Sequence, residues 1–208
     1  MVERPADWHV RQVGFFFLPA LAAIIGLPDG RNAIVRESDQ QCIVRTADCY
    51  ARNSAFRESA AGNFGYLSFQ TKEGLYEGYA AFSITDPGNA DGVITVGATH
   101  RYSPHTYGVS FFSSRGPTGD GRQKPDLVAP GERIHAPFRE DWGDLDGTSM
   151  AAPHVSGAAA MLMARFSEFI GQPRRIKDIL CQSATDLGRE RSFQGHGMLD
   201  VLRAFQSI

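Results

Sequence analysis

The chain has 208 residues, 42% of them hydrophobic and 21% charged, which is typical of an ordinary globular domain with a real core. Its formal net charge of −2, without a basic run, gives no electrostatic reason to expect a nucleic acid partner. The three cysteines, an odd number, exclude a fully paired disulfide framework, and Cys42, Cys49 and Cys181 lack the spacing of a metal site.

Residues 1–55 form a poorly specified N-terminal segment that we leave unassigned. The apolar run over 15–25 is too short for a membrane span and contains Pro19, so we expect no membrane partner. Two interpretations stay open: a secretory signal with a cleavage pattern at 20–22, or a buried hydrophobic segment. Acidic residues near the start argue against the signal. The polar stretch 31–57 has no clear period, which predicts a loop or poorly specified chain.

Three short stretches in the middle of the chain predict strands. Residues 93–98 are a β-branched run ended by polar residues, as expected of a strand buried on both faces. Residues 108–112 and 126–129 are further candidates, separated by Gly, Pro and Asp turn signals over 115–125.

A helix that begins at Ser149 carries the most informative residue. Apolar side chains follow at three-to-four-residue spacing, at Val155, Ala158, Ala159, Leu162, Met163 and Phe166. Ser149 would lie at the N-terminus of this helix, behind the flexible Gly147. There, free backbone N–H groups and the helix dipole favour the negative charge that acyl transfer develops. The alternative is an ordinary serine helix cap.

Two further helical segments are expected, one opening at Pro173 and a short one over 199–205. Strands that alternate with helices indicate an α/β fold with a parallel sheet.

The string GTSMAAPHVSGAAA at 147–160 resembles the nucleophile segment of the subtilisin-like serine peptidases, the subtilases. Further stretches resemble that family in the same order: 60–65 its oxyanion-hole asparagine segment, 91–98 a core strand, 113–117 with 124–131 the approach to the serine, and 195–200 its closing turn. The resemblance implies a three-layer subtilisin-like α/β fold with a mostly parallel sheet, incomplete because the N-terminal part of the domain is missing. We therefore predict that 56–208 is the C-terminal part of a subtilisin-like peptidase domain.

The resemblance implies a serine endopeptidase that hydrolyses peptide bonds through an acyl-enzyme on Ser149. Asn63 would donate its side-chain N–H to the oxyanion, beside the backbone N–H of Ser149; the alternative is a turn asparagine between glycines. One departure is that 52–59 is polar, whereas the family leads into this segment with an apolar core strand. The resemblance also implies substrate contacts from Ala60, Ala61, Gly62 and Thr148.

The general base is missing from this pattern. Subtilisins order their triad as Asp, His and then Ser. The histidines ahead of Ser149 do not stand in the family's His-Gly-Thr-His pattern; they are His9, His100, His105 and His135. The aspartates ahead of Asn63 likewise lack the Asp-Ser/Thr-Gly setting; they are Asp7, Asp29, Asp39 and Asp48. We expect negligible peptidase activity from this chain alone, with Asp and His lost, misread from the gene, or supplied by an N-terminal subtilase fragment.

Two other functions remain in competition. A non-catalytic subtilase relative could bind extended peptides along a strand edge. An esterase with the order Ser, Asp, His could use Ser149 with Asp178 or Asp186 and His196, although Ala151 breaks its usual Gly-x-Ser-x-Gly pattern. We predict no cofactor, because no cluster of metal ligands stands out. Secretion is implied by the resemblance alone.

Overall fold

The computed structural model describes residues 22–26, 32–38, 41–45, 56–138 and 141–208. Cys49, His9 and the four aspartates ahead of Asn63 lie outside these residues, and the proposed signal cleavage pattern at 20–22 does so except for Ala22. The boundary after residue 55 therefore stays a prediction.

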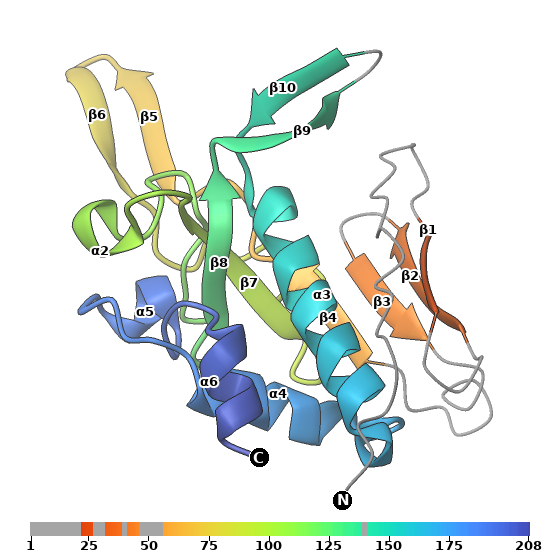
Figure 1. The fold of residues 1–208 in the computed structure, drawn as a ribbon. Coiled ribbons are helices and arrows are strands. Elements are labelled where there is room, and N and C mark those ends of the chain that lie inside the picture. Colours follow the sequence, from red (N-terminus) through yellow and green to blue (C-terminus); the bar gives the residue numbers. More distant parts are fainter. Residues whose placement is uncertain (1–21, 27–31, 39–40, 46–55, 139–140) are drawn as a thin grey trace, which may run out of the picture.

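A six-stranded sheet forms the centre of the fold, in the order β1-β2-β3-β4-β7-β8 (Figure 1). Its strands are β1 (Ala22–Gly26), β2 (Asn32–Ser38), β3 (Gln41–Arg45), β4 (Phe56–Ala60), β7 (Ile94–His100) and β8 (Leu127–Glu132). The pairs β4–β7 and β7–β8 are parallel, which confirms the expected α/β sheet in this part. The strands from β1 to β4 are joined antiparallel.

The loop predicted over 31–57 is wrong where β2, β3 and the start of β4 lie. β2 and β3 each contain two successive β-branched residues, an isoleucine followed by a valine, and Val35 of β2 lies opposite Val44 of β3. Such residues favour a strand even when polar neighbours hide the period. β4 also fills the place of the core strand, although it buries the polar side chains of Glu58 and Ser59.

The long helix α3 (Thr148–Arg165) packs on β3, β4, β7 and β8 and buries its apolar stripe against them. The helices α4 (Pro173–Gln182) and α6 (Val201–Gln206) join the same core. All three helices were predicted from their spacing. The remaining helical turns are short: α2 (Pro104–Tyr107), η1 (Ser167–Phe169) and α5 (Arg191–Gln194).

The strand predicted over 108–112 is wrong. Only Val109 bridges to Thr99, and the chain then turns, because the N–H of Ser113 bonds the carbonyl of Ser110 at 2.9 Å. The third cysteine, Cys181, is a buried thiol whose pKa is raised by burial to about 12, as suits a reduced structural side chain.

Two hairpins project from the sheet edge at which α3 begins (Figure 1). One is made of β5 (Tyr66–Thr71) and β6 (Gly74–Tyr79), and the other of β9 (Ile134–Phe138) and β10 (Asp141–Leu145). Both are antiparallel and neither belongs to the central sheet. They flank the N-terminus of α3.

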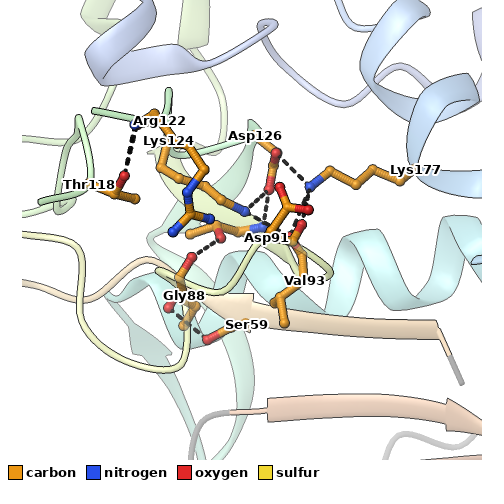
Figure 2. A network of polar contacts seen from close by, with 11 residues as sticks. Ser59, Gly88, Asp91, Val93, Thr118, Arg122, Lys124, Asp126 and Lys177 are labelled. Atoms are coloured by element: carbon orange, nitrogen blue, oxygen red, sulfur yellow. Dashed lines mark hydrogen bonds and ion pairs between the residues drawn. The ribbon is translucent and has the colours of Figure 1, made fainter. Parts of the chain in front are cut away.

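At the opposite edge, a buried ionic network joins the starts of β7 and β8 (Figure 2). Asp126 accepts from Lys124 Nζ at 2.5 Å, from Lys177 Nζ at 2.9 Å and from the N–H of Thr95 at 2.7 Å. The carbonyl of Val93 also accepts from both lysines. Burial lowers the pKa of Lys124, and Asp126 opposes that shift.

Candidate functional site

Ser149 is the second residue of α3, and a tight turn presents it at the mouth of that helix. The N–H of Gly147 donates to the carbonyl of Gly131 at 2.8 Å, which fixes the turn to the end of β8. Ser149 is half-buried. Within the part of the chain that the structure describes, the N–H of Ser149 has no hydrogen-bond acceptor. This free N–H points from a helix N-terminus, where an anion is favoured.

Asn63 follows β4 and meets α3 at its first residue. The oxygen Oδ1 accepts from the backbone N–H of Thr148 and from Thr148 Oγ1, both at 3.0 Å. A backbone N–H can only donate, so the atom facing it must be the amide oxygen. This contact fixes the amide and directs Nδ2 away from Thr148.

The amide nitrogen of Asn63 borders the space in front of Ser149. A Cβ atom built on Gly147 would lie 3.3 Å from Asn63 Nδ2 and 3.8 Å from the backbone nitrogen of Ser149. Both nitrogens thus lie within 4 Å of one position beside Gly147, as a pair of donors to a carbonyl oxygen that gains negative charge would require. A Cβ on Gly131 would lie only 2.7 Å from the carbonyl oxygen of Gly147, so glycine is needed there.

The four predicted substrate contacts are mostly below the surface. Ala60, Ala61 and Gly62 are buried, and the N–H of Gly62 donates to Thr148 Oγ1 at 3.1 Å. Thr148 is 1% exposed and joins Gly62 to Asn63. The side chain of Thr148 therefore connects the start of α3 to the segment after β4. A substrate-binding role for these four residues stays a prediction.

The structure brings no histidine to Ser149 within the described ranges: no hydrogen bond there joins Ser149 Oγ to an imidazole nitrogen. His154 Nδ1 instead contacts the carbonyl of Met150 at 3.0 Å. On the β9–β10 hairpin, His135 Nδ1 lies 2.8 Å from Asp144 Oδ1.

The residues of the esterase alternative lie at the other end of the sheet. The N–H of His196 donates to the carbonyl of Asp126, just before β8, whereas Ser149 is held to its far end. A six-residue strand spans about 20 Å. Asp186 accepts from Gln194 Nε2, and Asp178 lines a cavity at the starts of β4 and β7. The structure therefore does not unite these residues with Ser149.

Among the described residues, no group of three or more His, Cys, Asp or Glu side chains could hold a metal ion. None of the helices described there is long and apolar enough to cross a membrane.

A sequence model described as the subtilase family matches residues 32–198. The chain belongs to the subtilase family. Among solved structures, the self-cleaved protease domain of PatA is similar, with a TM-score of 0.57 and 27% identity. That alignment covers 77% of this chain and 52% of the solved one.

Three curated proteases are similar to this chain, and each alignment covers only part of the relative's length. Pyrolysin of Pyrococcus furiosus is 40% identical over 113 residues, which are 48% of this chain and 8% of pyrolysin. The human membrane-bound transcription factor site-1 protease is 38% identical over 109 residues, 48% of this chain and 10% of that protein. Subtilisin DY of Bacillus licheniformis is 30% identical over 149 residues, covering 71% of this chain and 46% of that enzyme. The chain thus spans less than half of each.

The sequence did not predict the two hairpins that flank the site of this subtilase. The stretch Tyr66–Tyr79 contains Thr71-Lys72-Glu73-Gly74, and Thr71 Oγ1 closes the turn by bonding Gly74 and Glu73. Turn residues between two runs rich in Tyr, Phe and Leu are the local signal that could have found this hairpin.

Proposed function

We propose that this chain is the nucleophile-bearing part of a subtilisin-type serine endopeptidase. Ser149 Oγ attacks the peptide carbonyl and forms an acyl-enzyme, which water then hydrolyses. Asn63 Nδ2 and the N–H of Ser149 stabilise the oxyanion. The observation that carries this proposal is the fixed Asn63 amide, anchored to Thr148 at 3.0 Å, beside the free N–H of Ser149.

A serine hydroxyl needs a base to take its proton as it attacks. We propose that a second segment, carrying the family's aspartate and histidine, supplies this base and packs on the outer face of α3. On that face, Met150 and Pro153 are half-buried, and His154 and Met161 are exposed. Their spacing places them on one side of the helix. This chain covers 52% of the solved PatA domain, so the remainder of that domain has no counterpart in the alignment.

The proposal is testable on the chain as it exists, because an activated ester makes fewer demands on the base than an amide. We expect a p-nitrophenyl ester of a short apolar peptide to acylate Ser149, and added imidazole to speed this step by acting as the missing base. Release of p-nitrophenol gives the rate, and mass spectrometry locates the acyl group. In the Ser149→Ala variant, no acyl group should be attached at position 149, with or without imidazole. If imidazole increased p-nitrophenol release equally in that variant and in wild type, the proposal would be contradicted.

The oxyanion role predicts a second result in the same assay. We expect Asn63→Leu to slow imidazole-assisted acylation by about 10² to 10³, a range known from a subtilisin, with little change in ester binding. Asn89→Leu is the control, since Asn89 Nδ2 bonds the Ile84 carbonyl and Asp86, away from the site. Equal rates in the two variants, at equal thermal stability, would reject Asn63 as a donor.

A peptide-binding role without catalysis is the second candidate. It is favoured by the exposed hairpins beside a serine that no described histidine contacts. Such a protein would bind extended peptides yet show no acylation of Ser149 with or without imidazole.

A further inference from the structure

On one face of the β5–β6 hairpin, none of the strand residues carries a charge. In its register, Leu67 lies opposite Gly78 and Phe69 opposite Tyr76. The rings of Phe69 and Tyr76 stack with centroids 5.9 Å apart and planes 16° apart. We call Leu67, Phe69 and Tyr76 the aromatic face.

The side chains of this aromatic face are about half exposed, and the Tyr76 hydroxyl donates to the Glu73 carboxylate in the turn at 3.2 Å. The exposed fractions are 44% for Leu67, 56% for Phe69 and 46% for Tyr76. A Cβ atom added at Gly74 or Gly78 would meet no atom within 4 Å. A contiguous apolar surface of this kind, with its charged neighbours in the turn or on the other face, marks a site of interaction.

The base of the hairpin is fixed to the body of the protein. The N–H of Gly65 donates to the Phe112 carbonyl, and the N–H of Ala80 donates to the Gly65 carbonyl, both at 2.9 Å. The guanidinium of Arg115 lies 4.8 Å from the Tyr79 ring centroid, and its Nε donates to the Ala80 carbonyl. These contacts hold the aromatic face at a set angle, so a ligand meets a preformed surface.

The hairpin is continuous with the site. Gly65, where it is anchored, is two residues from Asn63, and Figure 1 shows β5 and β6 rising from the sheet edge at which α3 begins. Six strand residues span about 20 Å. A polypeptide held at Ser149 could therefore reach the aromatic face only through several further residues.

We propose that the β5–β6 hairpin is a second substrate-binding element, which binds an extended apolar stretch of the polypeptide several residues away from the bond held at Ser149. β5 and β6 pair only with each other in the described part, so each has a free edge for an added strand. Edge pairing gives affinity, and the aromatic face selects apolar side chains. This inference rests on the proposed function, because it takes the polypeptide substrate as the occupant.

The test compares two fluorescein-labelled peptides of alternating leucine and serine, one of four residues and one of twelve, by fluorescence anisotropy with the full chain. We expect the double variant Phe69→Ser with Tyr76→Ser to weaken binding of the twelve-residue peptide at least tenfold and to leave the four-residue peptide unchanged. Leu75→Ser is the matched control. Leu75 is 60% exposed and lies on the other face of the same hairpin, opposite Gln70.

The acylation assay links the hairpin to Ser149. The twelve-residue peptide should inhibit acylation by the short ester, and the double variant should lose this inhibition. Equal binding of the long peptide by wild type and double variant would overturn the inference. Binding of the twelve-residue peptide without inhibition of acylation would also overturn the inference. So would sedimentation that shows the wild type as a dimer and the double variant as a monomer, because the aromatic face would then be a dimer interface. Absence of acylation itself refutes the proposed function separately.

Discussion

Supplying the family's aspartate and histidine segment should raise the peptidase turnover of this chain by about a million-fold. This is the loss measured when the serine or the histidine is removed from a subtilisin, and the three triad residues act as one unit. The expected partner is the part of subtilisin DY ahead of the region that this chain matches at 30% identity. Cleavage of an unfolded protein measures the gain, and sedimentation verifies that the two polypeptides associate.

Ser149→Ala separates catalysis from assembly. In the associated pair this variant should lose nearly the whole gain. In the isolated chain it should change peptide turnover little, because in the proposed mechanism the second segment supplies the base. A formed complex in which wild type and Ser149→Ala cleave equally well would refute Ser149 as the nucleophile.

Asp126→Ala should destabilise the fold by about 3–5 kcal/mol, the usual cost of breaking a buried ion pair. The variant leaves Lys124, 2% exposed, without its carboxylate and leaves the N–H of Thr95 without an acceptor. Urea unfolding followed by circular dichroism measures the loss. Asp120→Ala is the control. Asp120 is exposed, and its ion pair with Arg122 lies at the surface, where such a pair contributes little; its other partner is the Thr118 hydroxyl.

The same variant should become more stable as the pH rises. Burial lowers the pKa of Lys124, and Asp126 opposes this shift. Without Asp126, the pKa of Lys124 in the folded variant should therefore fall further below the pKa of this lysine in the unfolded chain. Between these two pKa values the unfolded state binds more protons, so the free energy of unfolding increases with pH. A variant as stable as wild type at pH 7, or one whose loss is the same at alkaline pH, would contradict this account of the network.

The spacing of apolar residues along the sequence predicted those helices and strands that bury apolar side chains in the central core. α3 was visible because its apolar stripe recurs at helical spacing behind Gly147, and β7 because Ile94 and Val96 belong to a short β-branched run. β2 and β3 were missed, since their apolar pairs are flanked by polar residues. The β5–β6 hairpin was missed for a different reason: it exposes large apolar side chains on both faces, including Phe69 and Leu75, so no buried face imposes an alternation.

The candidate site could be predicted only in part. Ser149 at a helix N-terminus follows from the local pattern, whereas its association with Asn63 came from the family resemblance. The hydrogen bond between Asn63 and Thr148 joins residues 85 positions apart in the sequence. The periodic pattern of a single helix or strand cannot predict a contact between residues so far apart. The anchoring role of Thr148 and the ring contacts of Arg115 likewise depend on tertiary packing.

That long-range bond also has a consequence for biosynthesis. Asn63 leaves the ribosome well before Ser149, and the two N–H groups meet only when the later helix docks on a finished sheet. In the proposed mechanism, a nascent copy therefore presents the Ser149 hydroxyl without its two N–H donors. Docking of α3 then precedes reactivity as a separate requirement from the arrival of the base.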